Sequence, residues 1–274
     1  MLKLNNLERV KIISRPSKIC KTPYVSDIEL NNGTIVQAHS ASLGCCGLCE
    51  KDCYVYASPI LSNCPQSKSK ICSYKIYLSE FCEEKIINKE NFINNEIIGI
   101  DPKMAETLVE KALTNNYLKT LKNIKCYKRE VKLGNSRFDF IGKDENNKKF
   151  ILEVKNVPLA DYADVCKNDR KKLEKAGLFN NKNFNEKISY FPDGYRKNKG
   201  AVVSPRALKH IEELEKIALE TKIKTYLCYV VQREDANRFQ TSILDPTYKQ
   251  AVKKASNNGV TIIVLQIKWT KEGE

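Results

Sequence analysis

The segment REVKLGNSRFDFIGKDENNKKFILEVK (residues 129–155) decides the fold and the chemistry expected of this chain. Its parts SRFDFIG and KFILEVK are typical of strands, and the polar loop KDENNK between them indicates a hairpin. Side chains alternate between the two faces of a strand. Glu153 and Lys155 are therefore expected to point to the same face, and the apolar residues beside them to the other face.

The first strand of this hairpin carries an aspartate between two aromatic residues. Asp139 is expected to point away from Phe138 and Phe140, whose rings require the core. Folding at KDENNK can then place Asp139 near Glu153. The sequence thus predicts a polar face with two carboxylates and one ammonium group, backed by an apolar face.

These groups are suited to metal-assisted hydrolysis. Two hard oxygen donors bind Mg²⁺ well, and a metal-bound water is a better nucleophile. A lysine can orient that water or neutralise charge on a phosphate in the transition state. Asp139, Glu153 and Lys155 are therefore candidates for a metal-dependent catalytic site in which the two carboxylates are the metal ligands. On the short ExK string alone, a surface Glu–Lys pair with an unrelated strand aspartate is the favoured interpretation.

Strands and helices alternate around this hairpin. The strings KCYKREVKL, KTYLCYVVQ and VTIIVLQIKW read as strands, and residues 160–200 read as polar and irregular. The first helix is expected to run to about Leu121. A capping residue stands before a proline, which marks a helix start, at three places: Asp101-Pro102, Ser204-Pro205 and Asp245-Pro246. This pattern predicts a mixed sheet flanked by helices.

The N-terminal part contains short strands and turns. YVSDIEL leads through Asn32-Gly33 into TIVQAHS, and Asn-Gly accepts the positive φ angles of a type I′ hairpin turn. Several such strands predict a small barrel or sandwich. We therefore expect two domains, residues 1–84 and residues 85–274.

The charge balance favours a polyanionic partner. Lys and Arg number 47 against 33 Asp and Glu, giving a net charge of +14. Nucleic acid or an anionic membrane surface would fit this charge, and a lysine-rich coding bias is the competing explanation. No stretch approaches the roughly 18 apolar residues of a membrane helix, and no secretory signal is visible. We expect an intracellular protein, cytoplasmic or nuclear, with organellar targeting left open.

Cysteines concentrate in residues 45–82, which hold most of the eleven. Without a secretory signal, free thiols or metal binding are favoured over disulfides. Cys46 and Cys49 form one CxxC and Cys53 follows, but no second CxxC or histidine pair completes a zinc ribbon. Structural zinc at these three cysteines is an open alternative, and we expect no stoichiometric zinc.

Longer strings resemble the sugar fermentation stimulation protein A (SfsA) family of the PD-(D/E)xK nuclease superfamily. The matching strings are EVKLGNSRFDF, ILEVKNVPL, YFPDGYRKNKG, RALKHIEEL and DPTYKQAVKKASNNGVTIIVLQIKW, with weaker matches at VKIISRPSK, HSASLGCC and GIDPKMAETLVEKAL. The resemblance covers almost the whole chain in family order. It implies a two-domain α+β protein, an N-terminal OB-like β-barrel followed by a restriction-endonuclease-like α/β domain with a mixed sheet.

The resemblance also implies roles for individual residues. Asp139 and Glu153 match the metal ligands and Lys155 the catalytic lysine, while Glu130 is a further metal-site candidate or, alternatively, an exposed strand residue. The nucleic-acid-binding residues implied are Arg137, Ser136, Lys209, His210 and Arg196. The chain departs from the family in extra Lys- and Asn-rich sequence before YFPDG and in its cysteine-rich insert.

The predicted function is that of a DNA-binding nuclease that hydrolyses phosphodiester bonds with Mg²⁺ or Mn²⁺. Its N-terminal domain would hold a strand through basic groups and stacked aromatic rings. Single- or double-stranded DNA fits, and RNA, the mode of cleavage and the oligomeric state are left open. The alternative is a non-catalytic DNA-binding regulator, because the family name derives from a regulatory phenotype. Retention of Asp139, Glu153 and Lys155 favours the enzyme.

Overall fold

The computed structural model divides the chain into two compact units. The described residues are 2–41, 47–60, 72–87, 90–192 and 203–274. Unit 1 comprises Met1–Met104, Gln232–Asp235 and Ile267–Glu274, and unit 2 comprises Ala105–Val231 and Ala236–Gln266. The chain therefore contributes to unit 1 in three separate segments.

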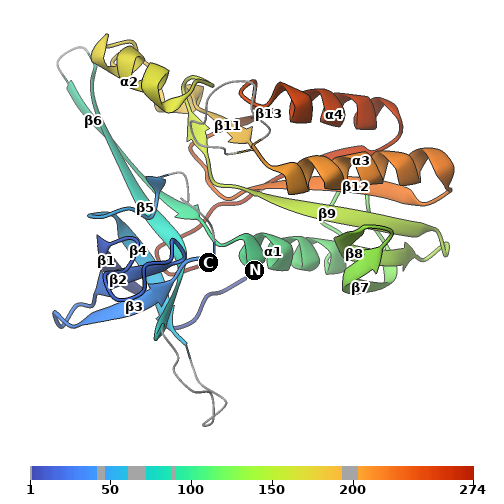
Figure 1. Ribbon diagram of the computed structural model, residues 1–274, viewed down its shortest axis with the longest axis horizontal. Coiled ribbons are helices and arrows are strands. Elements are labelled where there is room, and N and C mark those ends of the chain that lie inside the picture. The colour runs from blue at the N-terminus through green and yellow to red at the C-terminus, as the bar shows by residue number, and fades with distance from the viewer. Residues whose placement is uncertain (1, 42–46, 61–71, 88–89, 193–202) are drawn as a thin grey trace. The chain divides into compact units, whose positions relative to one another are not determined.

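Unit 1 contains a sheet of six strands (Figure 1). The strands are β1 (Glu8–Ser14), β2 (Val25–Glu29), β3 (Ile35–His39), β4 (Tyr54–Pro59), β5 (Tyr74–Ile87) and β6 (Glu90–Gly99). β3 pairs with both β2 and β5, so β1, β2, β3, β5 and β4 form a closed ring, and β6 extends it from β5. Fully buried Ile12, Ile28 and Leu78 belong to its core.

The β2–β3 hairpin forms where the sequence predicts it, with Ile28 opposite Val36. Gly33 has a φ of 80°, but the φ angle of Asn32 is not positive. The turn is therefore not of type I′, which needs positive φ at both central residues. Asn32 instead accepts a hydrogen bond from the Thr34 amide at 3.0 Å.

The division between the units differs from the expected boundary at residues 84 and 85. That boundary falls inside β5, which pairs with β6 from Leu78↔Gly99 to Ile87↔Glu90. The final strand also ends earlier than VTIIVLQIKW predicts, because the chain leaves the sheet of unit 2 after Gln266. Trp269 is buried in unit 1, where its indole donates to Gln232 Oε1 at 2.9 Å.

Unit 2 is built on a mixed five-stranded sheet in the order β14-β12-β9-β8-β7. These strands are β7 (Ile124–Leu133), β8 (Ser136–Asp144), β9 (Lys149–Val157), β12 (Lys224–Val231) and β14 (Thr261–Gln266). β9, β12 and β14 run parallel, whereas β7, β8 and β9 are antiparallel. β10 (Ala160–Asp161), β11 (Ile188–Phe191) and β13 (Arg238–Thr241) form a second, small sheet. The predicted mixed sheet is confirmed.

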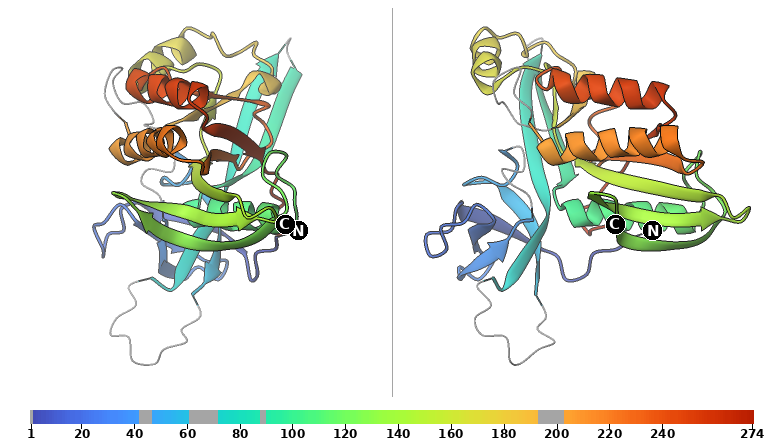
Figure 2. Two further views of the ribbon diagram at one scale, coloured as in Figure 1. Left: turned by 90° about the vertical axis from the view of Figure 1, so that its right-hand side faces the viewer. Right: turned by 45° about the vertical axis from the view of Figure 1, so that its right-hand side comes forward.

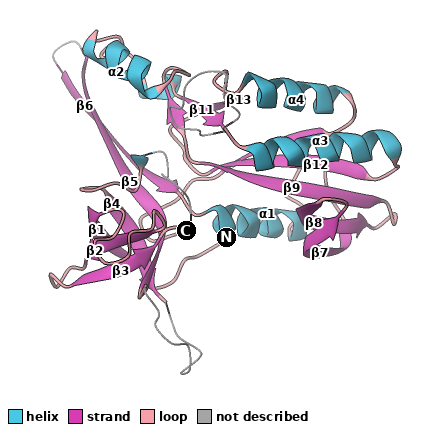
Figure 3. Cartoon of the chain, viewed as in Figure 1, coloured by secondary structure: helices cyan, strands magenta, loops and turns pink. Residues whose placement is uncertain are grey.

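Helices lie on both faces of this sheet (Figure 2). On one face, α3 (Pro205–Glu220) and α4 (Pro246–Asn257) pack against a core that includes Ile151 and Leu227. On the other face, α1 (Pro102–Thr114) approaches β7 through a hydrogen bond from Tyr127 to Glu110. Figure 3 shows the strands and helices by type. β8 and β9 therefore lie between α1 on one face of the sheet and α3 on the other face.

All three predicted helix starts are confirmed, because α1, α3 and α4 each begin at the proline of the predicted pair. The first helix is shorter than expected and ends at Thr114 rather than near Leu121. The polar segment after β10 contains α2 (Lys167–Lys175) and a 3₁₀ turn at Phe184–Glu186, which the irregular composition did not predict. No helix of the described residues is long and apolar enough to cross a membrane.

Candidate metal centre

The candidate centre lies where β8 and β9 stop pairing. Phe140↔Leu152 is the last pair of their ladder, and one more pair would place Asp139 opposite Glu153. Instead, Asp139 Oδ2 accepts a hydrogen bond from the Val154 amide at 2.7 Å. The aspartate side chain thus binds the neighbouring backbone at the point where the two strands separate.

Glu153 is held by partners from two elements. Its side chain is almost fully buried, with 2% of the residue exposed. Glu153 Oε1 forms an ion pair with Lys155, two residues along β9, and lies 2.5 Å from His210 Nδ1 on α3. The Lys155 ammonium and His210 Nδ1 are 3.5 Å apart. Glu153 Oε2, in contrast, is buried without a hydrogen-bond partner among the described residues.

The two carboxyl groups differ in protonation. Burial raises the pKa of Asp139 to about 7, together with the charges of Glu153 and, less strongly, Glu106, while Lys155 opposes the rise. Burial also acts to raise the pKa of Glu153, but the Lys155 ammonium and His210 outweigh it and hold that pKa below its usual value. Without a cation, Glu153 is therefore ionised at neutral pH, whereas Asp139 is partly protonated there.

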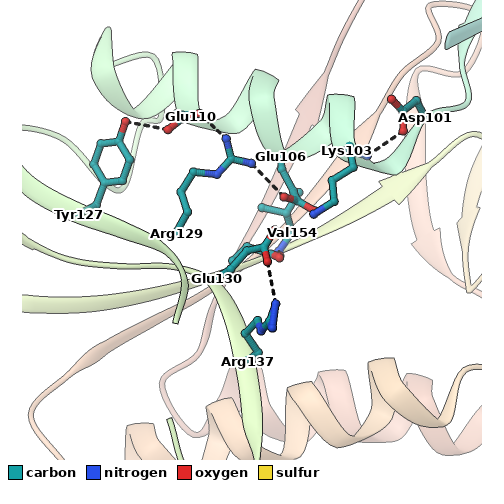
Figure 4. A network of polar contacts seen from close by, with 10 residues as sticks. Asp101, Lys103, Glu106, Glu110, Tyr127, Arg129, Glu130, Arg137 and Val154 are labelled. Atoms are coloured by element: carbon teal, nitrogen blue, oxygen red, sulfur yellow. Dashed lines mark hydrogen bonds and ion pairs between the residues drawn. The ribbon is translucent and has the colours of Figure 1, made fainter. Parts of the chain in front are cut away.

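Glu130 lies opposite Asp139 on β7, between the pairs Arg129↔Phe140 and Val131↔Phe138. Its φ of 51° is left-handed, which is uncommon for a residue in a strand and costs conformational energy. The Glu130 side chain is 41% exposed, and its carboxylate pairs with Arg137 Nη1 at 2.8 Å (Figure 4).

The side chains around Asp139 do not alternate as the sequence predicted. Phe138 belongs to the core beneath α3 and α4, whereas the Phe140 ring lies on the opposite face, beneath the Arg129 guanidinium. The expectation that both rings share one face is therefore wrong. Glu130, directly across from Asp139, has a left-handed conformation, so the neighbouring strand β7 also departs from regular strand geometry at this pair.

Glu106 on α1 is a carboxylate that the sequence reasoning missed. It influences the pKa of Asp139 and pairs with Arg129 Nη2 at 3.0 Å, and Arg129 Nη1 binds Glu110 at 2.7 Å (Figure 4). Glu106 and Glu110 are four residues apart and so share one helix face. That spacing is visible in the string MAETLVEKAL, but its meeting with the strand Arg129 depends on the packing of α1 against the sheet.

The residues predicted to bind nucleic acid differ in their exposure. Arg137 is exposed, whereas Ser136 and His210 are buried at 4% exposure each, so these two side chains are not available to a nucleic acid at the surface. His210 instead contacts Glu153. Lys209 is exposed and donates to the Asn135 carbonyl at 2.7 Å. Arg196 lies outside the described residues.

The carboxylates fit a magnesium-type ion. Within the described ranges, no group of three or more His, Cys, Asp or Glu side chains is arranged to hold a metal. Mg²⁺ usually needs only one or two protein carboxylates, because waters and substrate phosphates complete its shell. Asp139 and the unpartnered Glu153 Oε2 can supply those two ligands. A buried carboxylate oxygen without a donor is costly, and a cation would remove that cost.

The cysteine cluster is only partly described. Cys46 lies outside the described residues. Cys49 is buried and free of a disulfide, and Cys53 Sγ lies 3.7 Å from the Gly47 carbonyl oxygen. Structural zinc at these cysteines stays an open alternative, and a protein without stoichiometric zinc stays the prediction.

Comparison with known proteins finds the sugar fermentation stimulation protein family. A model described as "Sugar fermentation stimulation protein RE domain" matches residues 103–167 and 179–273. A sugar fermentation stimulation protein homolog of Alteromonas mediterranea is 32% identical over 88% of this chain and 84% of that protein. One from Clostridium novyi is 27% identical over 95% and 90%, respectively. The solved structure of Pyrococcus furiosus SfsA in complex with Ca²⁺ has the same fold, with a TM-score of 0.70 at 18% identity, covering 100% of this chain and 94% of that one.

Proposed function

The chain belongs to the sugar fermentation stimulation protein family, and from this premise we propose that it is a DNA-binding nuclease that uses Mg²⁺ or Mn²⁺ to hydrolyse phosphodiester bonds. The observation that carries the proposal is that Asp139 and Glu153 lie together where β8 and β9 separate. Lys155 forms an ion pair with the Glu153 carboxylate at the same place. Perturbed carboxyl groups with a specific charged partner are typical of functional sites.

Asp139 and Glu153 would hold the divalent cation, and the Ca²⁺ in the Pyrococcus relative supports a cation of this class. When bound, such an ion lowers the pKa of a water and stabilises negative charge on a phosphate. Lys155 would turn its ammonium from Glu153 towards the attacking water or the phosphate oxygens, where its charge stabilises the transition state. Glu130 is a further ligand of this proposal once its carboxylate leaves Arg137.

The net charge of +14 supports a nucleic acid as the substrate. Arg137, two residues before Asp139 and 60% exposed, is suited to a phosphate next to the metal, and Lys209 to one further away. We also propose that the closed ring of strands in unit 1 acts as an OB-like barrel for the DNA strand. The exposed Tyr54, with the Arg9 guanidinium 3.7 Å from its ring centre, offers a platform for a base.

A non-catalytic DNA-binding regulator is the second candidate, and the basic charge alone would serve it equally well. Such a protein gains nothing from Glu153, which is buried with one oxygen unpartnered, or from Asp139, whose pKa is raised to about 7. Both features cost folding free energy that a binding surface does not need to spend. The site therefore favours the enzyme.

The test is incubation of the purified chain with labelled single-stranded DNA, double-stranded DNA and RNA, in Mg²⁺, Mn²⁺ or EDTA. We expect cleavage of DNA that EDTA abolishes. Asp139→Asn and Glu153→Gln keep the side-chain shape but remove a ligand charge, so each is expected to abolish cleavage and to retain DNA binding. Exposed Glu145→Gln, just beyond β8, is the matched control and is expected to cleave like the wild type.

Two results would contradict the proposal. Retained binding with no cleavage in any metal by the wild-type chain would favour the regulator. Cleavage that survives both Asp139→Asn and Glu153→Gln would place the activity elsewhere in the preparation or the chain.

A further inference from the structure

The two oxygens of the Glu153 carboxylate have different surroundings. Oε1 is contacted by both His210 Nδ1, at 2.5 Å, and the Lys155 ammonium. Oε2 is buried and has no hydrogen-bond partner within the described part of the chain. Rotation of the carboxylate would exchange the two oxygens, so the donors on Oε1 decide which oxygen stays open to a cation.

His210 is the more rigid of these two donors. It is 4% exposed on α3, and its ring centre lies 5.9 Å from that of the buried Phe138. α3 is fixed by Ile211 and Leu214, both fully buried in the core. Lys155, in contrast, reaches Glu153 with a flexible four-carbon side chain, and 12% of that side chain is exposed.

The chemistry of the contact fixes the role of the imidazole. A carboxylate only accepts hydrogen bonds, so His210 Nδ1 must carry the hydrogen that it shares with Glu153 Oε1. An imidazole in this position resembles the outer-shell partners that orient metal-binding side chains, with the usual roles of histidine and carboxylate reversed.

We propose that His210 is a positioning residue that fixes Glu153 Oε1 and thereby presents Oε2 to the divalent cation. The inference rests on the proposed function, because that function makes Glu153 a metal ligand. It also explains how Lys155 can leave Glu153 during the reaction, since His210 keeps one hydrogen bond to the carboxylate when the ammonium turns away. His210 therefore acts through Glu153 and does not contact DNA.

Three substitutions of His210 distinguish its role as a hydrogen-bond donor from a role in packing alone. The side-chain amide nitrogen of His210→Asn is as many bonds from Cα as Nδ1 is, so this variant keeps the donor. His210→Gln carries its nitrogen one bond further out, and His210→Leu fills space without a donor. Titration of each full-length protein with Mn²⁺, without DNA, measures the affinity of the site independently of turnover.

We expect His210→Leu and His210→Gln to bind Mn²⁺ roughly 10- to 100-fold more weakly than the wild type, the usual effect of losing an outer-shell partner. His210→Asn should stay within several-fold of the wild type. Urea unfolding in EDTA verifies that each variant folds. If the Leu variant does not fold, the comparison of Asn with Gln decides. A His210→Asn variant that does not fold contradicts the inference, because it retains the donor.

The outcomes separate this inference from the proposed function. Equal Mn²⁺ affinity in the wild type and all folded variants overturns the positioning role and leaves the proposed function standing. An Asn variant that binds as weakly as the Gln variant shows that packing, and not the Nδ1 donor, is what matters. A wild-type chain without a Mn²⁺ site, when Glu153→Gln binds equally little, overturns the proposed function itself.

Discussion

At the scale of single residues, the centre depends on an unequal pair of carboxyl groups. Asp139 and Glu153 come from adjacent strands, yet burial raises the pKa of Asp139 to about 7, whereas Lys155 and His210 overcome the effect of burial on Glu153 and lower its pKa. One group is thus ready for a cation at neutral pH, and the other must first release a proton. This asymmetry has a measurable consequence for metal binding.

We expect Mn²⁺ binding to strengthen as the pH rises towards 7 and to level off above it. Below pH 7 the Asp139 carboxyl holds a proton that the cation must displace, which weakens binding by up to about tenfold per pH unit. Calorimetry in two buffers with different ionisation enthalpies measures the proton released. Asp139→Asn should bind weakly and without this pH dependence, and an unchanged wild-type affinity from pH 5.5 to 8 would contradict the account.

Replacing Lys155 separates chemistry from metal binding. In Lys155→Ala, Glu153 keeps its contact with His210, so Mn²⁺ should still bind, but DNA cleavage should fall by at least about 100-fold because transition-state charge loses its ammonium. Cleavage rates at saturating Mn²⁺ measure the effect. Exposed Lys149→Ala, on the same strand, is the control and should cleave normally. A Lys155→Ala variant with full turnover would show that the lysine serves only the fold.

At the scale of elements, the residues that cap α3 and α4 are expected to stabilise the fold to different degrees. Ser204 Oγ accepts from the Ala207 amide at 3.3 Å, whereas the buried Asp245 accepts from two amides of the described residues, that of Tyr248 at 2.9 Å and that of Val203 at 2.8 Å. Asp245→Ala should therefore cost roughly 2–4 kcal/mol of unfolding free energy, and Ser204→Ala about 0.5–1 kcal/mol. Urea titration followed by circular dichroism measures both changes. Equal losses would contradict this ranking.

Local patterns were sufficient to predict many of these elements. The three Asp-Pro and Ser-Pro pairs mark the starts of α1, α3 and α4, because capping and the fixed φ of proline act within a few residues. The hairpin of β8 and β9 follows from the polar loop between two strand-like runs. The sequence also predicted that Asp139 and Glu153 come close, because register follows from loop length.

The contacts that complete the site could not be predicted in this way. Glu106 reaches the vicinity of Asp139 only through the packing of α1, and His210 reaches Glu153 only through that of α3. Both depend on residues far apart in the chain. The left-handed φ of Glu130 is also invisible in the sequence, since strand patterns give no sign of a local conformation that tertiary contacts impose.

At the scale of the whole molecule, the domain division depends on distant segments. Residues 232–235 and 267–274 return to unit 1, where Gln232 binds the indole of Trp269. A boundary placed where the cysteine-rich composition ends cuts β5, because pairing between β5 and β6 is a property of the sheet and not of local composition. The alternation of strand patterns cannot show to which unit a strand belongs.

The overall charge predicts how DNA binding responds to salt. With a net charge of +14, the logarithm of the association constant should fall linearly with the logarithm of the salt concentration. The slope of this line should be about −0.9 per phosphate contact on duplex DNA. Fluorescence anisotropy in EDTA, between dilute and physiological buffer, measures the slope. Arg137→Ala should make it shallower by about one contact, with exposed Lys271→Ala as the control. A flat dependence would indicate that the lysine content reflects coding bias.

The most direct test of the account is anomalous diffraction from crystals of the wild-type protein soaked in Mn²⁺. We predict a single strong peak within coordination distance of the Asp139 and Glu153 carboxylates, on the side of Glu153 Oε2, with His210 still bound to Oε1. The peak should disappear in Glu153→Gln crystals. A peak elsewhere, or none at this position while Asp139 and Glu153 stay folded as described, would contradict the assignment of a metal-dependent centre.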